Sequence, residues 1–187
     1  MPTAHLHAVL LSPVVELARA SGVVRTGLRK QPVTGRIWLG PRGLAGDECA
    51  DRKHHGHEDQ ALCVYPMEYY PAWREWLGLD AAAFPYGSFG ENFTTSGLVE
   101  SEVFAGDQVR IGEAVVEVTK PRQPCATLNR VWERPDFAAH MGREGWTGWY
   151  MRVLTPGHVD AGDAWELLVR QPHAQSIAAL WAAKRDC

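Results

Sequence analysis

Glycine and proline punctuate the whole chain, with 18 and 12 copies in 187 residues, and leave only short apolar stretches between them. Glycine adopts turn conformations that other residues avoid, and proline lacks the backbone N–H that a central strand or helix needs. Short apolar or alternating stretches between such residues are typical of β-strands joined by tight turns. We therefore expect a mainly β fold with a few helices, whose strands form a single twisted barrel-like sheet.

Turn sequences support the β interpretation at three places. Gly112 separates two apolar stretches and is expected to form the tight turn of a hairpin. The sequence Ala-Gly-Asp begins at Ala105 and again at Ala161, and each copy leads into an alternating stretch. In such a turn, glycine can take a positive φ and aspartate can bond the backbone. The expected strands are His7–Leu11, Arg36–Leu39, Ala61–Tyr65, Val103–Ile111, Ala114–Thr119, Gly148–Leu154 and Ala164–Val169.

Helical spacing of apolar residues is found in three further stretches, Pro66–Leu77, Pro135–Met141 and Gln175–Lys184. In the first of them, Pro71 is expected in the first turn or at a break. No linker or low-complexity tract interrupts the chain. We expect one domain over residues 1–172, followed by a helical tail over residues 173–187.

Charge and targeting signals restrict the possible partners. The net charge of −3 and the pI near 6.2 offer no basic surface for duplex nucleic acid. The N-terminus lacks a positive segment followed by an apolar one, so no secretory signal is expected. No apolar run approaches the roughly 20 residues of a membrane span. These features predict a soluble cytoplasmic protein with no membrane or duplex nucleic-acid partner.

The four cysteines are Cys49, Cys63, Cys125 and Cys187. None of them forms a C-x-x-C pair, so zinc ribbons and iron–sulfur clusters have no support from spacing. In a reducing compartment all four are expected to be reduced thiols. Cys49 and Cys63 are interpreted as structural.

Polar and turn-forming residues interrupt the strand pattern in three segments, over residues 43–59, 86–93 and 120–128. In the third segment, Cys125 follows two prolines and has Lys120 and Arg122 close by in sequence. Nearby cations lower the pKa of a thiol and favour the thiolate, which is the form that attacks electrophiles or binds metals. An inert buried cysteine is the alternative, but loops carry function more often than cores do.

The other two segments leave alternatives open. His54, His55 and His57 are potential zinc ligands, but their spacing is not that of a helical zinc motif, and a solvated loop or an anion site with Arg52 is equally consistent. Asn92 lies in a glycine-rich turn, where its amide can either support the turn or read the edge of a heterocycle. The chain contains no dinucleotide, P-loop or serine-hydrolase motif, so no nicotinamide, flavin or nucleotide site is expected.

The sequences GLAGDECADRKHHG, GENF and PRQPC follow one another in an order and spacing that resemble the MOSC domain family (molybdenum-cofactor sulfurase C-terminal domain), close to its YiiM-type bacterial members. The resemblance extends from Lys30 to Asp163. It implies a MOSC-type twisted β-barrel with a short C-terminal helix and a site for the molybdenum cofactor (molybdopterin). It also implies that the motif cysteine, here Cys125, is the catalytic residue and the protein ligand of the metal.

Other site residues follow from the same resemblance. Lys30, Arg52 and Asn92 stand where the family contacts the pterin and its phosphate. His54, His55 and Arg122 adjoin the motifs. The candidate cofactor-binding set is therefore Lys30, Arg52, His54, His55, Asn92, Arg122 and Cys125.

The resemblance implies a molybdenum-dependent reductase of N-hydroxylated small molecules, such as hydroxylaminopurine-type bases. Because the chain has no flavin, NAD or iron–sulfur motif, its electrons must come from an external donor such as a flavin reductase. The alternative is a sulfur carrier in which Cys125 holds a persulfide received from a pyridoxal-phosphate-dependent cysteine desulfurase. A cofactor-binding protein without turnover is a third possibility.

Overall fold

The computed structural model describes residues 4–50 and 57–185, and its largest sheet has eight strands in the order β13-β9-β10-β11-β7-β8-β1-β4. Adjacent strands are antiparallel, except that β7 and β8 are parallel. The strands are β1 His5–Leu11, β4 Gln31–Pro32, β7 Leu62–Pro66, β8 Phe93–Ser96, β9 Gln108–Ile111, β10 Ala114–Pro121, β11 Trp149–Thr155 and β13 Glu166–Val169.

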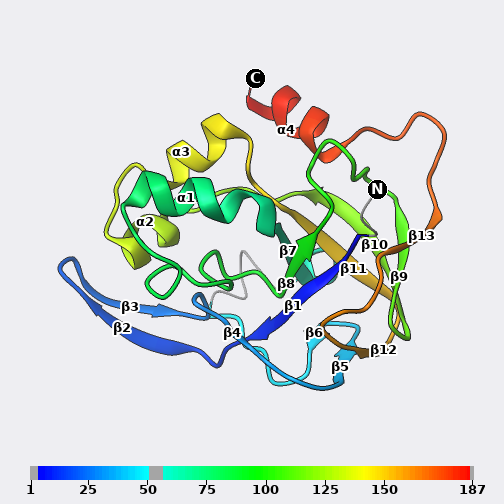
Figure 1. Cartoon of the computed structure of the whole chain (residues 1–187), viewed down its shortest axis with the longest axis horizontal. Coiled ribbons are helices and arrows are strands. Elements are labelled where there is room, and N and C mark those ends of the chain that lie inside the picture. Colours follow the sequence, from blue (N-terminus) through cyan, green and yellow to red (C-terminus); the bar gives the residue numbers. More distant parts are fainter. Residues whose placement is uncertain (1–3, 51–56, 186–187) are drawn as a thin grey trace.

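The sheet curls into half a barrel (Figure 1). Its curvature brings the start of β1 back to the segment that precedes β13, where the Leu6 amide donates to the Asp163 carbonyl at 2.9 Å. A bridge between His5 and Ala164 adds to this partial closure. The expected mainly β fold with a twisted barrel-like sheet is confirmed.

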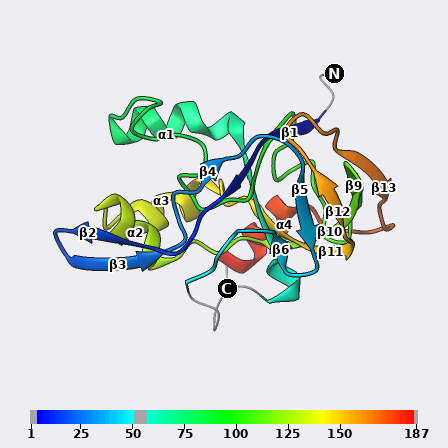
Figure 2. The same cartoon turned by 90° about the horizontal axis from the view of Figure 1, so that it is seen from below.

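Two smaller sheets complete the β structure. A ribbon of β2 Val15–Arg19 and β3 Gly22–Thr26 projects from the body and lies against α2 (Figures 1 and 2), where the Arg19 Nε donates to the Val131 carbonyl. The other sheet contains β12 Gly157–Val159, β5 Ile37–Gly40 and β6 Gly43–Leu44.

Four α-helices are present in the described residues, α1 Tyr70–Leu77, α2 Ala126–Trp132, α3 Phe137–Glu144 and α4 Ile177–Arg185, with 3-10 turns at Glu58–Gln60 and Met67–Tyr69. In both views α1, α2 and α3 gather at one side of the molecule, with the curled sheet at the other. None of the described helices is long and apolar enough to cross a bilayer.

The core has two parts. Aliphatic side chains of the sheet pack around Trp149. Ile177 of α4 belongs to the same cluster, so α4 docks on the sheet. The second part is aromatic and lies under α1, α2 and α3. At its centre Trp73 is fully buried, stacks on Phe137 with ring centroids 4.6 Å apart, and donates its indole N–H to the Tyr65 hydroxyl at 2.7 Å.

The local turn predictions are confirmed. Gly112 has a φ of 55° and joins β9 to β10, and Pro71 lies in the first turn of α1. In the two Ala-Gly-Asp turns, Asp107 and Asp163 accept hydrogen bonds from backbone amides three residues upstream, at 2.9 and 2.8 Å. The first of these turns also explains why β9 begins at Gln108 and not at Val103 as expected. Several elements were not expected from the sequence, namely β2, β3, β4, β6, β8, β12, α2 and the 3-10 turn Glu58–Gln60.

Candidate functional site

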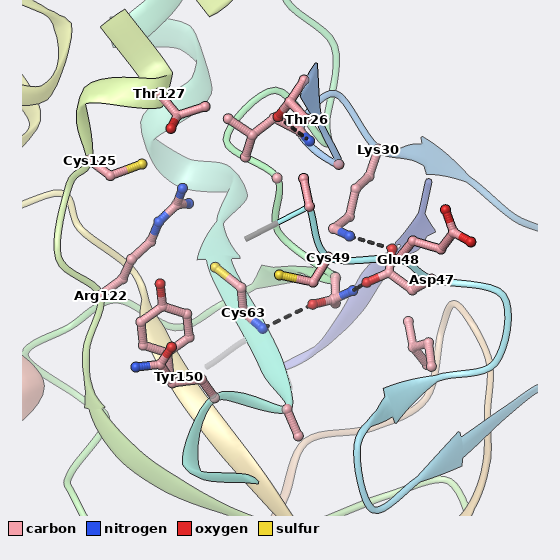
Figure 3. Close-up of a pocket in the computed structure, with 18 of the residues that line it drawn as sticks. Thr26, Lys30, Asp47, Glu48, Cys49, Cys63, Arg122, Cys125, Thr127 and Tyr150 are labelled. Carbon is pink, nitrogen blue, oxygen red and sulfur yellow. Dashed lines mark hydrogen bonds and ion pairs between the residues drawn. The ribbon is translucent and has the colours of Figure 1, made fainter. Parts of the chain in front are cut away.

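A cavity of about 290 Å³ lies between β7, the N-terminal end of α2 and the segments around β3, β4 and β6 (Figure 3). It collects residues that are far apart in the sequence. Its lining includes Arg25, Lys30, Arg42, Asp47, Cys49, Gln60, Cys63, Asn92, Arg122, Gln123, Cys125 and Tyr150. Four of the sequence candidates, Lys30, Asn92, Arg122 and Cys125, therefore lie together, and the third polar segment contributes two of them.

Cys125 immediately precedes α2 and keeps an extended backbone, with φ −121° and ψ 155°. The loop that carries it is anchored on the sheet, because the Arg122 amide donates to the Gly148 carbonyl at 3.1 Å. The thiol is partly buried and points toward the cavity (Figure 3). A rigid loop thus presents a sulfur donor to the cavity.

Arg122 is only 4% exposed, and its guanidinium lies in the cavity close to Cys125 (Figure 3). Its Nη2 donates to the Phe89 carbonyl, whereas its Nη1 is buried without a hydrogen-bond partner in the described part of the chain. Burial opposes the charge, but neighbouring acidic groups, first among them Cys63, raise the pKa of Arg122 above its ordinary value. Arg122 is thus a permanent buried cation whose Nη1 has no acceptor among the described residues.

Cys49 and Cys63 also line the cavity, although the sequence analysis treated them as structural. Cys63 belongs to β7 and is buried, and burial raises the pKa of its thiol. Residues 4–50 and 57–185 contain no group of three His, Cys, Asp or Glu side chains close enough to hold a metal ion. The sequence could have indicated Cys49 as a candidate, since it lies within the first polar segment, residues 43–59.

Lys30 and Asn92 hold the opposite wall together through Asp47. Lys30 is 5% exposed and forms an ion pair with the Asp47 carboxylate. The Asn92 Nδ2 donates to the same carboxylate at 2.7 Å, and its Oδ1 accepts from the Cys63 amide at 3.1 Å. Both ends of the Asn92 amide are therefore bound to protein.

Asp47 was not identified from the sequence, yet a signal for it existed. Ala45-Gly46-Asp47 is another copy of the Ala-Gly-Asp sequence, and Gly46 has the positive φ, 86°, seen in the other two. In all three turns the aspartate amide donates to a carbonyl three residues upstream, and for Asp47 the acceptor is the Leu44 carbonyl at 3.1 Å. The turn fixes the carboxylate that joins Lys30 to Asn92.

The loop over residues 87–91 is fixed by a buried carboxylate. Glu91 accepts from the Tyr70 hydroxyl, the Gly87 amide at 2.7 Å and the Phe89 amide at 3.2 Å. Gly87 has a φ of 91°, and a Cβ there would lie 2.0 Å from the Lys30 carbonyl, so only glycine fits. The loop therefore places the Phe89 carbonyl where Arg122 donates to it.

The Glu91 carboxyl gives a pH prediction. Burial raises its pKa in the folded protein above the value of about 4.3 expected in the unfolded chain. Between the two pKa values the unfolded chain has lost this proton while the folded protein still holds it. The free energy of unfolding therefore falls as pH rises from the unfolded pKa to the folded pKa. Replacing Glu91 with Gln removes this contribution, and the difference in unfolding free energy between wild type and Glu91→Gln is expected to fall from pH 4 to pH 8 in urea titrations.

The matched control is Glu16→Gln on the exposed face of β2. Its urea titrations should run parallel to those of the wild type over the same pH range. Parallel curves for Glu91→Gln as well would contradict the assigned shift.

Three candidates lie outside the described residues, namely Arg52, His54 and His55. Two cations that were not considered, Arg25 and Arg42, line the mouth of the cavity and are exposed. They could have been found only from the fold, since they lie on separate segments with no motif. The lining of the cavity in the described chain thus includes buried cations, Lys30 and Arg122, and exposed ones, Arg25 and Arg42.

A profile of the MOSC domain matches residues 51–166, a stretch that contains Cys125 and Arg122. The chain belongs to the MOSC domain family. It is 41% identical to YflK from Bacillus subtilis over 154 residues and 42% identical to YiiM from Escherichia coli over 145 residues. These alignments cover 82% and 78% of this chain but only 68% and 65% of the relatives, so this MOSC chain spans about two thirds of their length.

A more distant relative from Gibberella moniliformis bears the name reductase. It is 34% identical over 150 residues, which cover 80% of this chain and 27% of that protein. Among solved structures, YiiM from Geobacillus stearothermophilus superimposes with a TM-score of 0.77 at 30% identity and covers 97% of this chain and 83% of its own. The MOSC fold of this chain is therefore that of the YiiM structures.

Proposed function

We propose that this chain is a molybdenum-cofactor-dependent reductase of N-hydroxylated small molecules, with Cys125 as the protein ligand of the metal. One observation carries the proposal. The thiol of Cys125 and the buried guanidinium of Arg122 lie together at one cavity in a chain of the MOSC family. The name of the Gibberella moniliformis relative is consistent with reduction.

The cavity suits the cofactor chemically. A thiolate is a soft donor of the kind that thiophilic metals prefer, and Cys125 offers it from a rigid loop. The phosphate of a pterin cofactor requires cations or N–H donors, which Arg25 and Arg42 supply at the mouth. The buried donor of Arg122 requires an acceptor that the described protein does not provide. The residues present therefore fit the group.

The protein would bind and orient, and the cofactor, when bound, would supply two-electron redox chemistry. In the proposed reaction an N–OH group takes up two electrons and two protons and is converted into an N–H group and water. The fixed charge of Arg122 favours an oxygen that gains negative character. The aromatic core behind Phe89 excludes water from that side of the cavity.

Turnover is expected to require an external electron donor, because the chain has no dinucleotide or flavin motif. A molybdenum-loaded preparation should reduce an N-hydroxylated purine with a chemical reductant and with NADPH plus a flavin reductase. NADPH alone should give no product. Product formed with NADPH alone would contradict the prediction, and absence of product in all three mixtures would contradict the proposed reaction.

A second function is favoured by the three thiols that line one cavity, Cys49, Cys63 and Cys125. In this alternative Cys125 carries a persulfide from a pyridoxal-phosphate-dependent cysteine desulfurase. Elemental analysis separates the two functions. Near-stoichiometric molybdenum with pterin supports the reductase, and labile sulfur without metal supports the carrier.

A further inference from the structure

Two residues that line the cavity, Arg122 and Gln60, each carry a buried side-chain atom without a hydrogen-bond partner among the described residues, Nη1 and Oε1 respectively. A buried polar atom without a partner costs about 1–3 kcal/mol, so such atoms are rare in folded proteins. The guanidinium N–H can only donate, and the amide oxygen can only accept. The wall of one cavity therefore includes a residue with an unused donor and a residue with an unused acceptor.

Other polar side chains of the wall are already engaged. The Asn92 amide binds Asp47 and the Cys63 amide, and Lys30 is paired with Asp47. These groups shape the cavity, but they already form hydrogen bonds or ion pairs with other groups of the protein. The Oε1 of Gln60 and the Nη1 of Arg122 have no such partner among the described residues.

The fold fixes these two groups relative to each other. Gln60 ends the 3-10 turn Glu58–Gln60, which is tied to β10 by two interactions with Asp59. The Thr119 hydroxyl donates to the Asp59 carbonyl at 2.7 Å, and the Lys120 ammonium pairs with the Asp59 carboxylate at 2.5 Å. Arg122 follows two residues later in the chain. The acceptor and the donor are thus held by the same strand end before any ligand binds, which lowers the entropy lost on binding.

We propose that Gln60 and Arg122 form a recognition pair for a ligand that carries an N–H or O–H donor beside an oxygen acceptor. The inference rests on the proposed function, whose two ligands share this pattern. The oxo-amide edge of a pterin has it, and so does the N-hydroxylated group of a purine-type substrate. Gln60, which the motif analysis did not select, becomes a specificity-determining residue.

The test uses cofactor-free full-length protein from a host that cannot make the cofactor. Binding of two probes, pterin-6-carboxylate and 6-hydroxylaminopurine, is measured by fluorescence quenching and calorimetry. Gln60→Met keeps the length of the side chain but removes the acceptor, so binding of at least one probe is expected to weaken about tenfold. Gln60→Glu keeps an oxygen acceptor at the same place and is expected to bind the affected probe more tightly than Gln60→Met does.

Gln123→Met is the matched control. Gln123 also lines the cavity, but its Oε1 already accepts from the Lys184 ammonium at 2.8 Å. Its replacement is expected to leave the binding of both probes unchanged. Thermal unfolding checks that every variant is folded.

The outcomes separate the two sources of the ligand pattern. Weaker pterin binding assigns the pair to the cofactor, and weaker binding of the N-hydroxylated purine assigns it to the substrate. Wild-type affinity of Gln60→Met for both probes, or no binding of either probe by the wild type, overturns the inference. The proposed function fails on a different measurement, the absence of molybdenum and pterin from wild-type protein made in a cofactor-producing host.

Discussion

Replacing Cys125 with Ser is expected to leave the folded protein without bound molybdenum. A serine hydroxyl remains protonated at neutral pH and is a hard oxygen donor, so it replaces neither the charge nor the softness of a thiolate. Because the Cys125 side chain points toward the cavity, its replacement removes the sulfur donor that the loop before α2 supplies. Molybdenum per chain, measured by mass spectrometry after purification from a cofactor-producing host, is expected to fall to background.

Cys49→Ser provides the matched control, since Cys49 is also partly buried and lines the same cavity. That variant should keep wild-type molybdenum. Full retention of the metal in Cys125→Ser would remove Cys125 as the ligand. Loss of metal in both variants would indicate that the thiols act together.

Replacing Trp73 with Ala is expected to lower the free energy of unfolding by about 3–5 kcal/mol. The side chain is fully buried, so its removal leaves a large cavity under α1. The stack on Phe137 is lost, and so is the hydrogen bond from the indole to the Tyr65 hydroxyl. Urea unfolding followed by circular dichroism measures the change.

Trp38→Ala makes the same substitution on the surface, where the side chain is 46% exposed. Its cost is expected to be clearly smaller than that of Trp73→Ala, because nearly half of the Trp38 side chain is already in solvent in the folded protein. Similar losses for Trp73→Ala and Trp38→Ala would contradict the central place of Trp73 in the aromatic core.

Local sequence signals predicted much of the sheet, because a turn and its flanking strands are neighbours in the chain. The Gly112 hairpin and the Ala-Gly-Asp turns are examples. The ribbon of β2 and β3 was missed because its side chains are largely exposed, so no apolar alternation marks it. Helix α2 was missed because its seven residues, Ala126–Trp132, are too few to show a helical period of apolar side chains.

In the candidate site, too, residues that are neighbours in the sequence were predicted, and residues that meet only in the folded chain were not. Cys125 and Arg122 were found because they share one short motif. The contribution of Asp47 was not predicted, because its partners Lys30 and Asn92 lie 17 and 45 residues away in the sequence and meet it only in the folded chain. Gln60 carries no sequence signal, and only the unpaired state of its buried oxygen identifies it.

The position of β11 in the sheet has a consequence for the order in which the protein matures. β11 lies between β10, which leads to Cys125, and β7, which carries Cys63. Tyr150 of β11 pairs with Lys120 on one side and with Cys63 on the other. During synthesis, both halves of the site leave the ribosome before the strand that joins them. The two halves of the site can therefore be joined in one sheet only after β11 has been translated.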